Sequence, residues 1–359
     1  MTDSPALIPR TADAALELAL REKLQRRNDV AGGFGELEPL ALRLGLMQAS
    51  LAPSFRYPQL MVFAADHGLA VDGITGPRRC TTAELVQQLL AAQMPLAAFA
   101  RHQGIGLTVV DAGVADRLPQ AEGLLVRKIA HGTRNARVSA AMSFDQAHAA
   151  IRAGLELADG LPGNVIGCAA MGVGADESAA LVLSKLGAIP VRELLVSGPR
   201  MSQHQLAHLL VIAQGAQGRH KDVEDPIEVL AAYGGFEAAM MVGVMLGAAR
   251  RRGLVLVDGL AACAALLVAS RVDPGVQDYA LFCRSHGHLG LDRALRLFRA
   301  SALLELGLHT GDGCGAALAW PLVNCAAALL SDVAELPAPR LPVEEEDEGA
   351  PDSVPSALQ

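Results

Sequence analysis

The stretch Thr310-Gly311-Asp312-Gly313-Cys314-Gly315 places glycines at alternate positions around one carboxylate, and an Ala- and Leu-rich segment follows it. Glycine lets the backbone come close to a ligand and leaves N–H groups that point toward it. An aspartate among such glycines is a candidate general base or anion-sensitive switch. The alternative is a structural turn in which Asp312 caps the helix that follows, because short glycine-rich patterns often occur without a ligand.

Four further apolar segments also end in polar residues or glycines. The residues at their ends are Asp66-His67-Gly68, Gly172-Val173-Gly174, Asp258-Gly259 and Ser285-His286. Uninterrupted apolar runs of this length are typical of strands buried on both faces of a sheet. Because ligands bind at the carboxyl ends of strands in open α/β sheets, we expect these residues to gather at one edge. In the alternative interpretation, Asp66 only caps the next element and His67 is a half-buried loop residue.

The order of the expected elements predicts the fold class. Apolar strands alternate with helical segments, which favours an α/β protein with a doubly wound, mostly parallel, Rossmann-like sheet. Helices are expected over 11–28, 36–50, 81–101, 143–158, 177–187, 203–213, 238–250 and 261–270, with a polar linker at 214–225. The expected organisation is a small helical domain from both chain ends (1–50 and 321–336), a large α/β domain with the active site (51–320), and a disordered acidic, proline-rich tail (337–359).

Composition excludes several classes of partner. The net charge is −8, and the Lys and Arg residues are scattered, so nucleic acid is not expected as a partner. The six cysteines form no CxxC pair, which favours reduced thiols, and the N-terminus shows no signal-peptide pattern. The most apolar run, Leu254–Ser270, is interrupted by Asp258-Gly259 and is too short for a membrane span. We therefore expect a cytoplasmic protein with no membrane partner.

Ten short stretches, in one order over roughly residues 30–335, carry a family resemblance. They are residues 35–38 (GELE), 63–68 (FAADHG), 110–114 (VDAGV), 132–135 (GTRN), 141–143 (AMS), 233–237 (YGGFE), 243–249 (GVMLGAA), 257–259 (VDG), 285–286 (SH) and 311–316 (GDGCGA). Together they resemble the nicotinate-nucleotide–dimethylbenzimidazole phosphoribosyltransferases of cobalamin synthesis. No single stretch is decisive, but their number and order are specific.

The resemblance implies a reaction. Phosphoribose moves from nicotinate mononucleotide to a nitrogen of 5,6-dimethylbenzimidazole or a related base, giving nicotinate and α-ribazole 5′-phosphate, in a homodimer that needs no metal or redox cofactor. Asp312 stands where the family has its general base. The residues implied to shape the phosphate and ribose site are Gly172, Gly174, Gly311, Gly313 and Gly315, and those implied to line the pocket are Asp66, His67, Gly68, Asp258 and Ser285.

The sequence also departs from the family pattern. Its general base is Glu, whereas Asp312 is one methylene shorter; a loop Glu of the family is Ala170 here; and no lysine occurs between Lys185 and Lys221, where the family has a phosphate-binding lysine. His204 or His208 is a candidate replacement, against the alternative of histidines on a solvated helix face. Two other functions therefore stay open: a divergent paralogue with a changed donor or acceptor, or a non-catalytic protein that binds nucleotide or benzimidazole.

Overall fold

The computed structural model describes residues 8–74, 80–195, 201–284, 289–308 and 313–334. Within them, one sheet has the strand order β3-β2-β1-β4-β5-β6-β7, and every neighbouring pair is parallel. Its strands are β1 (Gln59–Ala65), β2 (Gly106–Gly113), β3 (Leu124–Val126), β4 (Val165–Met171), β5 (Leu254–Val257), β6 (Ala280–Arg284) and β7 (Ala302–Leu304). This topology confirms the predicted doubly wound α/β class.

Helices connect and cover these strands. They are α1 (Ala14–Ala31), α2 (Leu37–Gln48), α3 (Thr82–Leu90), α4 (Pro95–His102), α5 (Phe144–Asp159), α6 (Ala175–Gly187), α7 (Val191–Leu195), α8 (Gln203–Arg219), α9 (Pro226–Tyr233), α10 (Phe236–Arg250), α11 (Leu260–Val272), α12 (Leu289–Leu297) and α13 (Cys314–Ser331). Two short 3-10 helices, η1 (Gly68–Asp72) and η2 (Pro274–Tyr279), complete the described elements.

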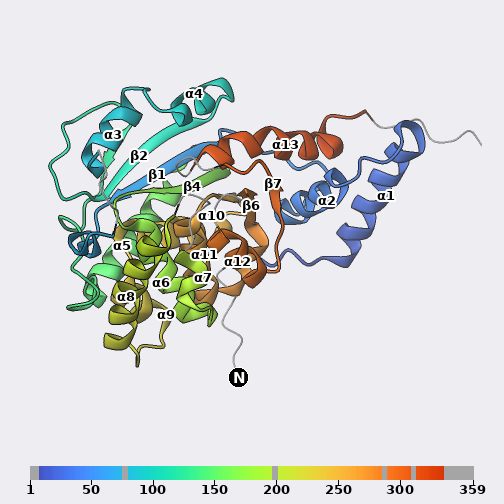
Figure 1. The fold of residues 1–359 in the computed structure, drawn as a ribbon. Coiled ribbons are helices and arrows are strands. Elements are labelled where there is room, and N and C mark those ends of the chain that lie inside the picture. The colour runs from blue at the N-terminus through green and yellow to red at the C-terminus, as the bar shows by residue number, and fades with distance from the viewer. Residues whose placement is uncertain (1–7, 75–79, 196–200, 285–288, 309–312, 335–359) are drawn as a thin grey trace, which may run out of the picture.

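The sheet lies between two helical layers. Helices α10 and α11 pack on one face, and α4 and α13 lie on the other, as Figure 1 shows. Six of the seven residues of β1 are buried, which agrees with the uninterrupted apolar run that the sequence places there. Helix α10 is buried along almost its whole length because α5 covers the side that faces away from the sheet.

The residues of both chain ends pack together. Helices α1, α2 and α13 contact one another at one end of the molecule (Figure 1). Helix α13 runs continuously from Cys314 to Ser331 with Pro321 inside it, so the boundary expected at 320/321 falls within a helix. The division into domains stays a prediction.

Two sequence expectations about helices are wrong. A single helix over 81–101 is in fact α3 and α4, because Met94 is extended before Pro95 and the proline begins a new helix. The linker expected at 214–225 is helical up to Arg219, since Ala213 and Ala216 continue the buried face of α8.

Helix α13 is apolar and long enough to cross a membrane by length and composition alone. However, 56% of it is buried inside the protein, and it contacts β4, β6 and β7 of the sheet. Its hydropathy is therefore accounted for by packing against the core.

Candidate functional site

The carboxyl ends of β1 and β4 mark the switch point of the sheet, where the strand order reverses. The chain proceeds from β1 to β2 on one side and returns to β4 on the other, and Ala64 pairs with both Asp111 of β2 and Met171 of β4. Such a reversal leaves a crevice in which open α/β sheets bind ligands. Asp66-His67-Gly68 follows β1 here, and Gly172–Gly174 follows β4, so the structure brings these two predicted groups together.

Asp66 connects the loops that follow three strands. Its Oδ1 accepts a hydrogen bond from Thr82 Oγ1 (2.5 Å), and its Oδ2 accepts one from the N–H of Ala115 (2.8 Å), beyond β2. The same Thr82 Oγ1 accepts from the N–H of Val173 (3.1 Å), beyond β4. The Asp66 carbonyl also accepts from the N–H of Thr133 (3.0 Å). Asp66 thus organises the backbone around the crevice, which is more than the capping role that the sequence left open.

His67 forms a buried ion pair with Glu237 at the start of α10. The distance from Nε2 to Glu237 Oε1 is 3.0 Å, and both side chains are almost completely buried. Burial of the ring opposes protonation, but the nearby carboxylates of Glu237, Glu177 and Asp66 outweigh it and raise the pKa of His67 above its ordinary value. The ring and the carboxylate are poorly aligned for a hydrogen bond, and Glu237 Oε2 has no hydrogen-bond partner among the described residues. His67 is therefore a buried residue paired with a carboxylate, and the alternative of a half-buried loop histidine is wrong.

The two glycines after β4 are required by close backbone contacts. A Cβ at position 172 would lie 1.9 Å from the carbonyl oxygen of Ala65. Gly174 has φ +97° and lies against the His67 side chain, where an added Cβ would be 2.8 Å from His67 Cβ. Both positions therefore exclude other residues, and they hold the loop after β4 directly beside the loop after β1.

A second cluster forms where β5 and β6 meet the beginning of α13. Asp258 is completely buried, and its Oδ1 accepts from Arg284 Nε (2.5 Å). Its Oδ2 accepts from the N–H groups of Gly313 (2.7 Å), Gly315 (2.8 Å) and Ala316 (3.2 Å). Asp258, which follows the distant strand β5, therefore caps α13. The N–H groups of Gly313 and Gly315 donate to this carboxylate of the protein. The roles predicted for these three residues toward a ligand stay predictions.

Several predicted residues lie outside the described part of the chain. They are Gly311, Asp312 and Ser285. The structure does describe Gly313, the residue after Asp312, and its N–H donates to Asp258.

Lys128 and His208, which lie near this edge, both make contacts within the protein. Lys128 Nζ pairs with Asp111 (3.2 Å) and donates to the carbonyls of Val114 (2.5 Å) and Asp116 (2.9 Å), so its three donors are all used. His208 Nε2 lies 2.9 Å from the carbonyl oxygen of Asp72, which requires an N–H at that nitrogen. His208 thus contacts the loop after β1, whereas His204 is exposed.

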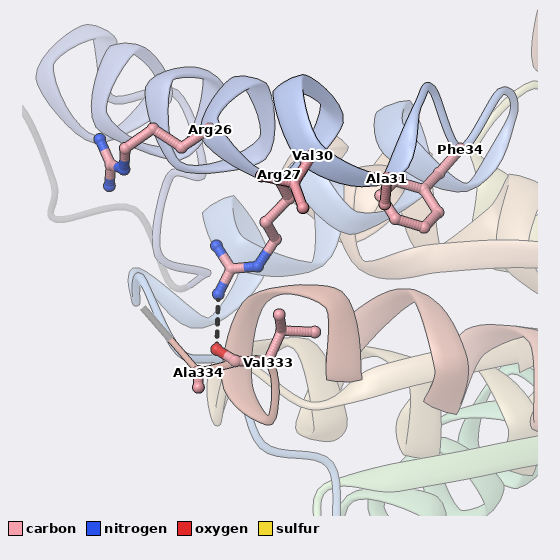
Figure 2. Close-up of a pocket in the computed structure, with 7 residues that line it drawn as sticks. All are labelled: Arg26, Arg27, Val30, Ala31, Phe34, Val333 and Ala334. Atoms are coloured by element: carbon pink, nitrogen blue, oxygen red, sulfur yellow. Dashed lines mark hydrogen bonds between the residues drawn. The ribbon is translucent and has the colours of Figure 1, made fainter. Parts of the chain in front are cut away.

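Three other kinds of feature in the described chain could indicate a site: metal-ligand clusters, buried thiols and the pocket beside α1. Three or more His, Cys, Asp or Glu residues do not gather around a possible metal position among the described residues. Burial raises the pKa of Cys168 to about 12 and raises that of Cys283 as well, so neither thiol is a thiolate nucleophile near neutral pH. A pocket of about 120 Å³ lies between α1 and the end of α13, where Arg27 Nη2 donates to the carbonyl of Val333 (Figure 2). None of its lining residues follows a strand.

Sequence reasoning missed three residues of the two clusters: Thr82, Glu237 and Arg284. Glu237 stands in the stretch 233–237 that contributes to the family resemblance, which was the available signal. Arg284 is the one charged residue in an otherwise apolar strand. Thr82 gave no signal, because a Thr81-Thr82 pair before a helix is explained by capping alone.

Comparison with known proteins places the chain in a family. The model of a family described as phosphoribosyltransferase matches residues 9–338. The chain is 42% identical over 325 residues to the nicotinate-nucleotide–dimethylbenzimidazole phosphoribosyltransferase of Cupriavidus taiwanensis, covering 90% of this chain and 94% of that protein. It is 39% identical over 328 residues to the protein of the same name from Dechloromonas aromatica, with coverage of 90% and 94%.

Solved structures agree with this relationship. The crystal structure of the protein of that name from Thermus thermophilus superposes with a TM-score of 0.82 at 28% identity, covering 89% of this chain and 96% of that one. Sequence similarity and fold thus agree. The chain belongs to the nicotinate-nucleotide–dimethylbenzimidazole phosphoribosyltransferase family.

Proposed function

We propose that the protein transfers phosphoribose from nicotinate mononucleotide to 5,6-dimethylbenzimidazole or a related base, which supplies the lower ligand of cobalamin. The observation that carries this proposal is similarity along nearly the whole chain, at 42% identity, to a relative named for these two substrates. The loops of the switch point support it, because they lie where α/β sheets bind their ligands.

In the proposed reaction, a ring nitrogen of the base attacks C1′ of the ribose, and the C1′–N bond to nicotinate breaks. The electron pair of that bond returns to the pyridinium nitrogen, so nicotinate leaves without needing a proton. The attacking ring loses its N–H proton, and we assign its acceptance to the carboxylate of Asp312. The loop Gly172–Gly174 and the start of α6 are the proposed site for the ribose phosphate, since glycine-rich loops and helix N-termini favour anions. We further propose that the protein acts as a cytoplasmic homodimer, as the family resemblance implies.

The first test is product formation with two variants of Asp312. With the wild-type protein, nicotinate mononucleotide and 5,6-dimethylbenzimidazole should yield α-ribazole 5′-phosphate, measured by chromatography. Asp312→Asn should lower kcat roughly 10²- to 10⁴-fold, the usual contribution of a general base. In isothermal titration its affinity for nicotinate mononucleotide should stay within about threefold of wild type. Asp312→Glu restores the family's residue and should keep turnover; equal activity of wild type and Asp312→Asn would remove Asp312 from the role of base.

One specific observation favours a second function, transfer from a changed donor. Ala170 replaces the family's loop Glu, and the described residues Lys128 and His208 make contacts within the protein. Titration with nicotinate riboside and, in parallel, with nicotinate mononucleotide distinguishes the two proposed functions. Tighter binding of the nucleotide supports the first proposal, whereas equal binding of the riboside favours the paralogue with a donor that lacks phosphate.

A further inference from the structure

Thr82 is the first residue of α3 and is 1% exposed. It lies between the two loops of the switch point, although it follows neither strand. Its Oγ1 donates to Asp66 Oδ1 at 2.5 Å and accepts from the N–H of Val173 at 3.1 Å. One hydroxyl group therefore uses its donor and an acceptor lone pair at the same time.

These two side-chain hydrogen bonds connect the loop after β1 with the loop after β4. Through Thr82, the carboxylate of Asp66 is coupled to the backbone of Gly172–Gly174, the loop that we propose for the ribose phosphate. The second oxygen of Asp66 accepts from Ala115, beyond β2. Asp66 and Thr82 thus fix the loops after β1, β2 and β4 relative to one another.

The charge on Asp66 makes the first bond strong. A hydrogen bond to an ionised carboxylate is roughly twice as strong as one between neutral groups. Removing the hydroxyl of the buried Thr82 would leave both Asp66 Oδ1 and the Val173 N–H without this partner. The loop after β4 would then lose its fixed distance from Asp66.

The neighbouring Thr81 provides a contrast. Its hydroxyl accepts from the N–H of Glu84, and the Glu84 side chain accepts from the N–H of Thr81, which forms a capping box at the exposed start of the same helix. Thr81 therefore stabilises α3, and its side-chain hydrogen bond stays within the first turn of that helix. The two adjacent threonines separate a role in helix stability from a role in the arrangement of the site.

We infer that Thr82 is a positioning residue for phosphoribosyl transfer: its hydroxyl holds the Gly172–Gly174 loop and Asp66 in the arrangement that receives the ribose phosphate of the nucleotide. This inference rests on the proposed function. It adds to that function a residue that needs no contact with substrate and acts through Asp66 and Val173.

The test uses the full-length protein and a series at one position. Thr82→Val keeps the shape and removes the hydroxyl, Thr82→Cys keeps a weak donor, and Thr82→Ser keeps the hydroxyl. The KM for nicotinate mononucleotide, the KM for 5,6-dimethylbenzimidazole and kcat are measured for each variant, together with the melting temperature. Thr81→Val is the matched control for loss of a hydroxyl in the same helix.

Thr82→Val should lower kcat/KM for nicotinate mononucleotide roughly 10- to 100-fold, mainly through KM, and leave the KM for the base within about threefold. Thr82→Ser should restore the wild-type values, and Thr82→Cys should fall between Ser and Val. Thr81→Val should lower the melting temperature and leave both KM values unchanged. If Thr82→Val does not fold, a higher nucleotide KM for Cys than for Ser decides in favour of the inference, and equal values decide against it.

Two failures are distinguishable. A wild-type protein that makes no product overturns the proposed function, and this inference with it. A wild-type protein that turns over, with a folded Thr82→Val variant of unchanged nucleotide KM, overturns the role of Thr82 alone.

Discussion

At the residue scale, the site is organised by carboxylates that accept hydrogen bonds from backbone N–H groups. Asp66 and Asp258 each follow a strand, and each accepts hydrogen bonds from loops that are distant in sequence. Asp258 is completely buried, and a carboxylate in that situation contributes more to the fold than a surface ion pair, because its partners are fixed and water is excluded. The residues that frame the crevice therefore also determine where its loops lie.

The pair of His67 and Glu237 makes stability depend on pH. Because the pKa of His67 in the folded protein is raised above the ordinary 6.5, the folded state binds this proton more tightly than the unfolded chain does. Its stabilising contribution is fully present below about pH 6.5 and is lost as the pH rises through the folded-state pKa. Glu237→Gln should remove most of this dependence and lower the free energy of unfolding by about 3–5 kcal/mol at pH 6.

Urea unfolding between pH 5.5 and 9 measures this effect. Glu228→Gln, in the exposed first turn of α9, is the matched control and should follow the wild-type pH profile. An unchanged pH profile in Glu237→Gln would contradict the assignment of the titration to this pair.

The sequence predicted part of this site. Asp66, His67 and Gly172 could be placed at one edge because each follows an apolar run, and parallel strands end at a common edge. Their partners could not be placed, because Thr82 and Glu237 reach the edge only through the packing of α3 and α10. No sequence spacing carries that information.

At the element scale, α13 begins with a cap from another part of the chain. Its own N-cap residue is Gly313, which has φ +96° and no side chain to offer, and Asp258 supplies the carboxylate instead. This arrangement couples the glycine-rich segment to β5, and through Arg284 to β6. The placement of the chain that leads into α13 therefore depends on the central sheet.

Asp258→Asn should be strongly destabilising. It leaves Arg284 buried without its carboxylate partner, which costs about 3–5 kcal/mol in the free energy of unfolding. Asp225→Asn makes the same substitution at the exposed N-cap of α9, where Asn caps as well as Asp, and should change stability by less than about 0.5 kcal/mol. Urea denaturation of both variants tests the difference, and equal losses would refute the role of Asp258 as a buried anchor.

Element prediction failed where local signals were weak or interrupted. Strands β3 and β7 have three residues each and only intermediate burial or exposure, so they lack the continuous apolar run that marked β1. The stretch 214–219 predicted a linker because it alternates the polar residues Gln214, Gln217 and Arg219 with the small residues Gly215, Ala216 and Gly218, and so lacks large apolar side chains. The long central elements were predictable because burial on both faces demands an apolar sequence.

At the scale of the whole molecule, close contact between α5 and α10 determines how thick the helical layer is. A Cβ at Gly154 would lie 2.0 Å from the carbonyl oxygen of Met240, and one at Gly243 would lie 2.0 Å from that of Ile151. Both obstacles are backbone atoms, so the helices would have to separate to admit a methyl group. The small residues thus allow the helices to pack close to the sheet and to each other.

Gly243→Ala should therefore lower the free energy of unfolding by about 1–3 kcal/mol. Gly218→Ala is the matched control, because nothing lies within 4 Å of an added Cβ at that helical position. It should raise stability by about 0.5–1 kcal/mol, as expected when alanine replaces glycine in a helix. Thermal unfolding of the two variants checks the opposite signs, and a stabilising Gly243→Ala would show that the layers can separate without cost.

The contact of α2 with α13 also has a consequence during synthesis. About 270 residues separate the end of α2 from the beginning of α13, and the ribosome needs roughly 15–50 s to add them. Throughout that interval, the apolar side of α2 that α13 later covers is without its partner. The N-terminal helices therefore cannot complete their packing as they emerge, and the nascent chain presents a surface for chaperones until the last helix has left the ribosome.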